Sequence, residues 1–206
     1  KLAAEKGYIF FKDIDSLIKS IDAVVIVSPT TTHFEIAKKC IKNGKHIFVE
    51  KPLTTNSEEA RIINKLANEN NIIGQVGFVE RYNQAFISCR EFINNPKFIE
   101  SHRLSDFNPR GTDVSVIMDL MIHDIDIILN INQSKVKKID ASGVSIISST
   151  PDIANARIEF DNGCIANLTS SRISLKKMRK TRIFQDNAYI SINFLEKDFQ
   201  VVKIRD

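Results

Sequence analysis

A run of β-branched residues in the first third of the chain constrains the fold most strongly. Residues 23–27 read AVVIV, which is typical of a strand buried on both faces of a parallel sheet. Helix and strand patterns then alternate, and we expect a helix over 33–43, a strand over 46–49, a helix over 56–70 and a strand over 72–78. This alternation predicts an α/β fold with a doubly wound parallel sheet.

The second half of the chain has a different pattern. We expect helices over 84–94 and 114–130, with a strand over 98–104 between them. The rest is almost entirely strand, in the segments 136–147, 154–160, 164–172, 182–185, 189–194 and 199–204. Asn162-Gly163 favours a hairpin turn, because this pair tolerates positive φ. We therefore expect two domains, 1–78 and 79–206, the second being an α+β domain with an open antiparallel sheet and helices on one side.

The composition is ordinary for a globular protein of the cytoplasm. Hydrophobic residues make up 43% and charged residues 26%, and the net charge of +4 does not by itself imply a nucleic-acid partner. No apolar run is long enough to span a membrane, and the first residues, KLAAEK, do not resemble a secretory signal. The three cysteines, Cys40, Cys89 and Cys164, form no C-x-x-C pair, which argues against disulfides and a zinc knuckle.

Glu50-Lys51-Pro52 follows the expected strand over 46–49. Ligands of open α/β sheets bind at the carboxyl ends of the strands, where a lysine can hold a hydroxyl oxygen as it loses its proton. Pro52 would fix the backbone beside Lys51. A solvated lysine in a loop explains the same tripeptide equally simply.

The segment 119–126, DLMIHDID, places Asp119, His123 and Asp126 on one face of an ideal helix. A carboxylate one turn from a histidine can orient the ring, which suits a general acid or base. Two alternatives explain the same pattern. His123 could be a core histidine with a hydrogen-bond partner, or Asp119 and His123 could supply two ligands of a metal site.

Ser28-Pro29-Thr30-Thr31-Thr32-His33 follows the first strand. Hydroxyl groups and backbone amides at the start of a helix suit ribose or phosphate oxygens, although helix capping alone would also explain them.

Together these motifs resemble the Gfo/Idh/MocA oxidoreductases, which include glucose–fructose oxidoreductase and inositol dehydrogenase. Four segments carry the resemblance, in the family's order and spacing: VSPTTTH (27–33), HIFVEKPLTTNSEEA (46–60), VGFVERYN (76–83) and DLMIHDID (119–126). The resemblance covers essentially the whole chain. It implies a dinucleotide-binding Rossmann domain in 1–78, followed by an α+β domain for substrate binding and oligomerisation.

The resemblance also implies an activity. It points to a dehydrogenase of CH–OH groups that uses NAD or NADP and acts on a sugar, polyol or nucleotide sugar. Lys51, Asp119 and His123 are then the catalytic group, with His123 or Lys51 taking the hydroxyl proton, and no metal is expected. The residues implied as cofactor contacts are Ser28, Pro29, His33, Glu50 and Lys51, and those implied near the substrate are Arg81 and Tyr82.

The sequence departs from the family pattern in ways that bear on the cofactor. The G-x-G-x-x-G loop that cradles a pyrophosphate is absent, and the chain contains only seven glycines. We therefore expect a chain cut at its N-terminus, and also at its C-terminus, that binds NAD(H) or NADP(H) weakly by itself and is inactive as a fragment. The segment that would select between NAD and NADP is missing with that loop.

Two basic features bear on the substrate. Arg110 precedes the expected catalytic helix and suits a phosphate or carboxylate. A basic cluster in the sequence consists of Lys176, Lys177, Arg179, Lys180 and Arg182. It looks similar to family members that act on nucleotide sugars, whose diphosphate would suit such charges, and a solvated loop is the alternative.

A non-catalytic binding or regulatory homologue with the same fold is the alternative function. A nucleic-acid partner is not expected, because no aromatic residues interleave with the basic cluster and stacking platforms usually need them. A homo-oligomer is expected, because one face of the second domain's sheet must be covered or solvated.

Overall fold

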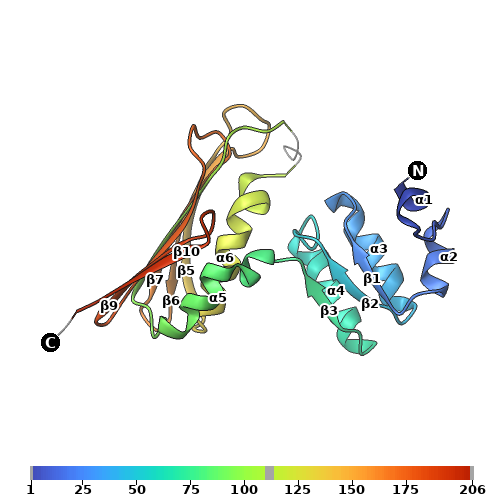
Figure 1. Cartoon of the computed structure of the whole chain (residues 1–206), viewed down its shortest axis with the longest axis horizontal. Helices are drawn as coiled ribbons and strands as arrows, with labels where there is room; N and C mark the ends of the chain where they lie inside the picture. The colour runs from blue at the N-terminus through green and yellow to red at the C-terminus, as the bar shows by residue number, and fades with distance from the viewer. Residues whose placement is uncertain (1, 110–113, 205–206) are drawn as a thin grey trace. The chain divides into compact units, whose positions relative to one another are not determined.

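The computed structural model describes residues 2–109 and 114–204. By internal contacts the chain divides into two compact units, Lys1–Gly77 and Phe78–Asp206 (Figure 1). Each unit encloses a hydrophobic core of its own.

The first unit contains a parallel sheet of three strands in the order β1-β2-β3. Its elements are α1 (Leu2–Lys6), α2 (Ile14–Lys19), β1 (Ala23–Ile26), α3 (Thr30–Lys42), β2 (His46–Val49), α4 (Ser57–Glu69) and β3 (Gly74–Val76). The register pairs Ala23 with His46 and Ile47 with Gly74, so all three strands run in the same direction. Their carboxyl ends therefore meet at one edge of the sheet, where ligands of such sheets bind.

Local sequence explains the helices of this unit. Asn56 begins α4 by accepting a hydrogen bond from the Glu59 amide at 2.9 Å, as expected of an N-terminal cap. Gly44, at φ +71°, follows the end of α3 in a left-handed conformation that glycine adopts without strain. Helix α3 begins at Thr30 and not near residue 33, because Pro29 takes the capping position with φ −57° and the threonines form the first helical turn.

The second unit is built on a sheet of seven strands in the order β10-β9-β8-β4-β7-β6-β5. Its strands are β4 (Phe98–Leu104), β5 (Val136–Val144), β6 (Ile153–Phe160), β7 (Ile165–Ser171), β8 (Met178–Gln185), β9 (Ala188–Asn193) and β10 (Asp198–Lys203). Helices α5 (Gln84–Cys89) and α6 (Ile122–Ile131) lie against one face of this sheet (Figure 1). The α+β arrangement is as the sequence predicts.

The sheet is not antiparallel throughout, because β4 and β7 pair in parallel, with Phe98 opposite Ile165. Strand β4 is inserted between β7 and β8, which follow each other in the sequence, and it pairs antiparallel with β8. A strand inserted between two neighbours that run in opposite directions must be parallel to one of them. The strand pattern along the chain carries no signal of such an insertion.

The helices of this unit are interrupted more often than expected. The helix expected over 84–94 is α5 followed by a 3-10 turn, Arg90–Phe92. The one expected over 114–130 begins as a π-helical turn, Ile117–Met121, and continues as α6. A π-helix has a wider turn than an α-helix and is frequent at functional sites, so the ideal face of Asp119 and His123 is altered where the two helix types join.

Candidate active site

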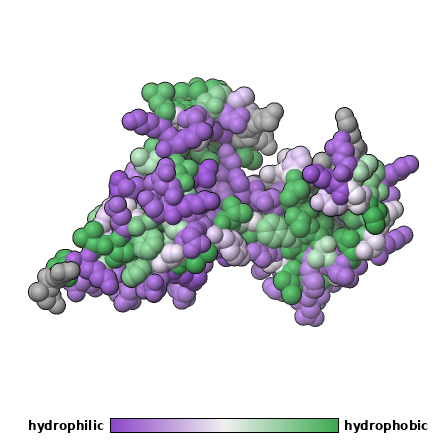
Figure 2. Space-filling model, viewed as in Figure 1, coloured by the Kyte–Doolittle hydropathy of each residue, from purple (hydrophilic) through white to green (hydrophobic). Residues whose placement is uncertain are grey.

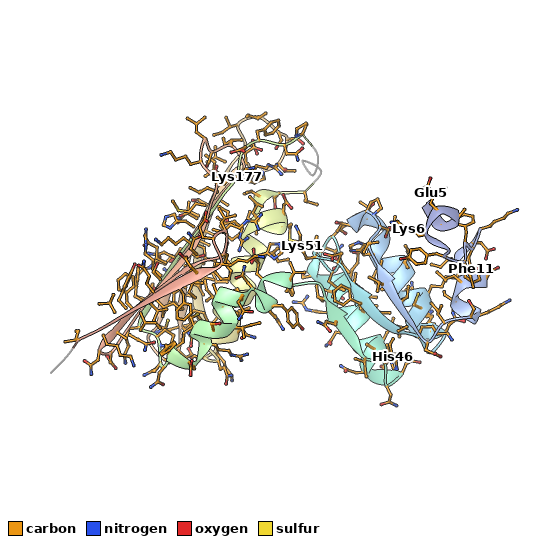
Figure 3. The ribbon with its side chains drawn as sticks, viewed as in Figure 1. Glu5, Lys6, Phe11, His46, Lys51 and Lys177 are labelled. Carbon is orange, nitrogen blue, oxygen red and sulfur yellow. The ribbon has the colours of Figure 1, made fainter. Side chains whose placement is uncertain are left out.

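Lys51 and Glu50 lie directly beyond the carboxyl end of β2, and Figure 3 labels Lys51 at this position. Both residues are half-buried, and a Glu50 carboxylate oxygen accepts a hydrogen bond from the Lys51 amide at 3.3 Å. The peptide bond between Lys51 and Pro52 is cis. The end of β2 thus holds one acidic and one basic side chain at the edge where ligands of parallel sheets bind.

Gly77 follows β3 at the same edge and makes room for Glu50. A Cβ atom at Gly77 would lie 3.0 Å from Glu50 Oε2 and 3.1 Å from its Cδ. Any other residue at position 77 would therefore push the Glu50 carboxylate out of its present position. The sequence analysis missed Gly77, and its position directly after a predicted strand was the signal available.

His33, expected as a cofactor contact, is 1% exposed and held from both sides. Its Nδ1 lies 2.9 Å from the Pro52 carbonyl oxygen, and its Nε2 lies 2.8 Å from that of Ser28. The ring therefore joins the turn after β1 to the turn after β2. This position makes His33 a support for the site.

The hydroxyl groups after β1 bind one another. Ser28 Oγ lies 2.6 Å from Thr32 Oγ1, which donates to the Pro29 carbonyl oxygen at 2.8 Å. Pro29, the capping residue of α3, makes no capping hydrogen bond through its side chain. Ser28 is half-buried and Pro29 exposed, at the edge that also carries Glu50 and Lys51.

In the second unit, His123 lies on α6 with 8% of its surface exposed, and Asp119 is half-buried in the π-helical turn that precedes it. Asp126 follows His123 by three residues on α6 and is 8% exposed. Arg81 Nε donates to Asp126 Oδ2 at 2.7 Å, and Arg81 Nη2 also donates to Oδ1. The Asp126 hydrogen bond raises the pKa of Arg81.

Arg81 and Tyr82, both expected near the substrate, differ in their surroundings. Arg81 joins the segment before α5 to α6 through Asp126, while Tyr82 is 65% exposed. Asn83 caps α5 by accepting from the Ala85 amide at 3.1 Å. Arg110 lies outside the described residues.

A buried ion cluster behind α6 was missed by the sequence analysis. Arg103, on the helix-facing side of β4, donates to both Asp124 carboxylate oxygens at 2.9 and 3.0 Å and to Glu80 at 2.8 Å. Burial disfavours the Arg103 charge, but Asp124 and Glu80 more than offset this, so the pKa of Arg103 lies above its ordinary value. An arginine within an otherwise strand-like segment was the only signal in the sequence.

A cavity of about 560 Å³ opens in this unit beside Asp119. Its lining residues come from the end of β4 and the segment after it, from the π-helical turn, from the start of β8 and the residue before it, and from the turn after β9: Leu104, Ser105, Asp106, Phe107, Asn108, Pro109, Asp119, Leu120, Lys177, Arg179 and Leu195. The volume lies within the range of small-molecule sites.

The structure divides the basic cluster. Lys177 and Arg179 line the cavity. Arg182 lies on the other face of β8, where it donates to Glu100 at 2.6 Å, and alternation along a strand places Lys180 on that face too. Strand β8 begins at Met178, earlier than expected, because charged residues alternate between the two faces there and hide the apolar pattern.

No group of three or more His, Cys, Asp or Glu side chains among the described residues is placed to hold a metal ion. Within residues 2–109 and 114–204, no helix is long and apolar enough to cross a membrane.

Two family models match the chain. The first, described as an oxidoreductase family with an NAD-binding Rossmann fold, covers residues 1–78. The second, described as the GFO/IDH/MocA C-terminal domain, covers residues 91–191. The fold and these matches define a Gfo/Idh/MocA oxidoreductase, and the chain belongs to this family.

Individual relatives agree with this assignment. UDP-N-acetylglucosamine 3-dehydrogenase of Acidithiobacillus ferrooxidans is 36% identical over 202 residues, which cover 98% of this chain and 64% of the relative. Its solved structure matches with a TM-score of 0.94 and covers 100% of this chain and 68% of that one. The NAD(+)-dependent scyllo-inositol 2-dehydrogenase of Bacillus subtilis is 32% identical over 171 residues, covering 75% of this chain and 49% of the relative. The chain thus spans less than two thirds of the length of these two curated relatives.

Proposed function

We propose that the protein is a dehydrogenase that transfers a hydride between a nicotinamide cofactor and the hydroxyl carbon of a sugar, polyol or nucleotide sugar. The observation that carries the proposal is a half-buried lysine, Lys51, at the ligand-binding edge of a Rossmann unit whose family is described as NAD-binding. The names of the two relatives support NAD as cofactor and a nucleotide sugar or an inositol as substrate class. NADP remains the second cofactor that the sequence allows.

The residues at the sheet edge suit a dinucleotide. Glu50, seated against Gly77, offers a carboxylate that can accept hydrogen bonds from hydroxyl groups. Ser28 and Pro29 form the neighbouring turn, and His33 fixes it against Pro52. When bound, the nicotinamide supplies a carbon that accepts the hydride.

We assign the proton chemistry to Lys51, Asp119 and His123. Lys51 holds the substrate hydroxyl and stabilises its developing negative charge, and His123 accepts the hydroxyl proton. The C–H bond breaks with its electron pair as the C=O bond forms. Asp119 steadies the imidazolium that results, and its place on the lining of the cavity supports a role next to the substrate.

We extend the proposal to a homo-oligomer in the cytoplasm. Three free, buried cysteines suit a reducing compartment. Val144, Ile146, Ile147 and Leu175 expose more than half of their surface, and Figure 2 shows hydrophobic residues gathered over the loops at that end of the second unit. Exposed apolar patches of this kind often mark protein interfaces.

The experiment is a substrate panel with the purified full-length protein, because the fragment by itself is expected to be inactive. NAD and NADP are each combined with UDP-N-acetylglucosamine, myo-inositol, scyllo-inositol and glucose, and reduced nicotinamide is followed by absorbance. We expect reduction with at least one of the substrates and a clear preference for NAD. Binding of a cofactor and a sugar with no reduction in any combination would favour a non-catalytic homologue.

A further inference from the structure

The cavity beside Asp119 contains features that the proposed chemistry does not use. Hydride transfer requires only that a hydroxyl group of the substrate lies near the catalytic residues. The lining of this cavity also contains two cationic side chains, Lys177 and Arg179. Figure 3 labels Lys177 in the loop that leads into β8. Two cations in a hollow that is large enough for a ligand suggest a second recognition element for the same substrate.

Arg179 is held in place from behind. Its Nη1 donates to Glu80 Oε1 at 3.3 Å, and the same oxygen accepts from Arg103 Nη1 at 2.8 Å. Arg103 is 2% exposed and Glu80 is 7% exposed, so this anchor is buried, while 45% of the Arg179 side chain remains exposed. A guanidinium group has five N–H donors, so binding one carboxylate oxygen leaves several for a ligand. Such preorganisation lowers the entropy lost on binding.

Lys177 can bind an anionic ligand at a small cost in free energy, because its present ion pair is weak. Its ammonium group lies 3.3 Å from an Asp106 carboxylate oxygen, and 65% and 55% of the two side chains are exposed. Exposed ion pairs contribute little stability, so a more highly charged anion can take the place of Asp106. Lys180 and Arg182 on the opposite face of β8 cannot contribute, which leaves a pair of cations and not a diffuse basic surface.

We propose that Lys177 and Arg179 bind the phosphate groups of a nucleoside diphosphate sugar, whose sugar end reaches toward Asp119. This inference rests on the proposed function and narrows its substrate class. Arginine and lysine together suit phosphate oxygens, which accept charge-assisted hydrogen bonds. Asp119 lines the same cavity, so its negative charge keeps the phosphates at the Lys177 and Arg179 end.

Phe107 distinguishes a nucleotide from a simple sugar phosphate. It lines the same cavity with 41% of its surface exposed. An exposed aromatic ring suits stacking of a nucleobase. A sugar phosphate would use the two cations but leave the ring of Phe107 uncovered.

The test is calorimetric binding of UDP and of inorganic pyrophosphate to the purified protein and to matched variants. The test variant is Lys177→Gln with Arg179→Gln, and the controls are Lys176→Gln, in the same loop, and Arg182→Gln, on the other face of β8. We expect the double variant to bind UDP at least roughly tenfold more weakly, and each control to bind within about twofold of wild type. Wild type should bind UDP more tightly than pyrophosphate, and Phe107→Ala should remove that difference.

The Glu80 contact makes folding a concern for Arg179, so Arg179→Lys with Lys177 intact serves as a second variant. It keeps the charge and should bind UDP with an affinity between wild type and the double variant. Equal UDP affinity of wild type and double variant, an equal loss in the controls, or no UDP binding by wild type would each overturn the proposal.

Failure of the subsite and failure of the proposed function give different results. If wild type oxidises a neutral polyol but does not bind UDP, the dehydrogenase proposal stands and the phosphate subsite is wrong. If UDP binding depends on Lys177 and Arg179 but no substrate reduces NAD or NADP, the subsite stands and the dehydrogenase proposal is wrong.

Discussion

At the scale of single residues, the proposed chemistry depends on Lys51 and His123. We predict that Lys51→Ala and His123→Ala each lower kcat at least about a hundredfold, because each removes a group acting on the transferred proton. Cofactor affinity should change little for His123→Ala, and Asp119→Asn should affect kcat more than substrate binding. Steady-state kinetics and nucleotide titration measure these effects.

The matched controls are Lys65→Ala, an exposed lysine on α4, and His102→Ala, a histidine on β4 that faces away from the helices. Both should keep wild-type kcat. If His102→Ala loses as much activity as His123→Ala, the loss reflects general damage and His123 is a core histidine.

Gly77 offers a test of the cofactor side of the site. A Cβ at Gly77 would press on the Glu50 carboxylate at 3.0 Å, whereas a Cβ at Gly74 would only touch Ile47 at 3.5 Å, an ordinary contact. We predict that Gly77→Ala weakens NADH binding by roughly tenfold, about the effect of one hydrogen bond to a charged group, and that Gly74→Ala does not. Fluorescence titration of NADH would decide, and equal affinities would remove Glu50 from the cofactor site.

The position of Lys51 in the fold could be predicted from the sequence, whereas the contacts that hold the site together could not. Lys51 could be placed because it directly follows a recognisable strand pattern, so that the prediction depends only on residues that are neighbours in the sequence. The partners of His33 and Arg103 could not be predicted: Pro52 lies 19 residues from His33, and Glu80 lies 23 residues from Arg103. Such contacts depend on tertiary packing, which periodicity does not reveal.

At the scale of elements, one carboxylate organises the connection between β5 and β6. Asp152, 0% exposed, accepts hydrogen bonds from the Ser148 hydroxyl and from the Ile146, Ile147 and Ser148 amides, and Arg172 donates to it at 2.9 Å. The hydrogen bonds from Ser148, above all, hold the pKa of Asp152 far below its ordinary value of 3.8. The charged form is therefore favoured in the folded state.

This shift gives a signed pH dependence. Above pH about 4, Asp152 is ionised in both the unfolded and the folded chain, so its full contribution to stability is present. Below this pH the unfolded chain binds a proton at Asp152 while the folded chain does not, so the free energy of unfolding falls. We predict that the free energy of unfolding declines more steeply with acid in wild type than in Asp152→Asn. Urea denaturation at a series of pH values tests this, and parallel curves for the two proteins would contradict it.

Element types were predictable and their pairing was not. The alternating strands and helices of the first unit and the strand-rich second unit follow from hydrophobic periodicity. The insertion of β4 between β7 and β8 and the π-helical turn before α6 do not, because both are decided by long-range packing.

At the scale of the whole molecule, the two cores shield every thiol. Cys40 lies in the core of the first unit, and Cys89 and Cys164 lie in that of the second, each at most 1% exposed. Burial raises the pKa of Cys89 to about 11. Since the thiolate is the reactive form, we predict that no cysteine of the native protein reacts rapidly with a disulfide reagent, and that all three react in denaturant. A native cysteine reacting as fast as free cysteine would show that its unit opens readily.

The central claim is that a hydride leaves a hydroxyl carbon and reaches a nicotinamide. The most direct measurement uses a substrate from the panel that carries deuterium on the carbon being oxidised, with mass spectrometry of the nucleotide after turnover. We predict that the reduced nicotinamide gains one deuterium and that His123→Ala forms the same labelled product far more slowly. Reduced nicotinamide without deuterium, or an oxidised sugar with no reduced nicotinamide, would contradict hydride transfer in this protein.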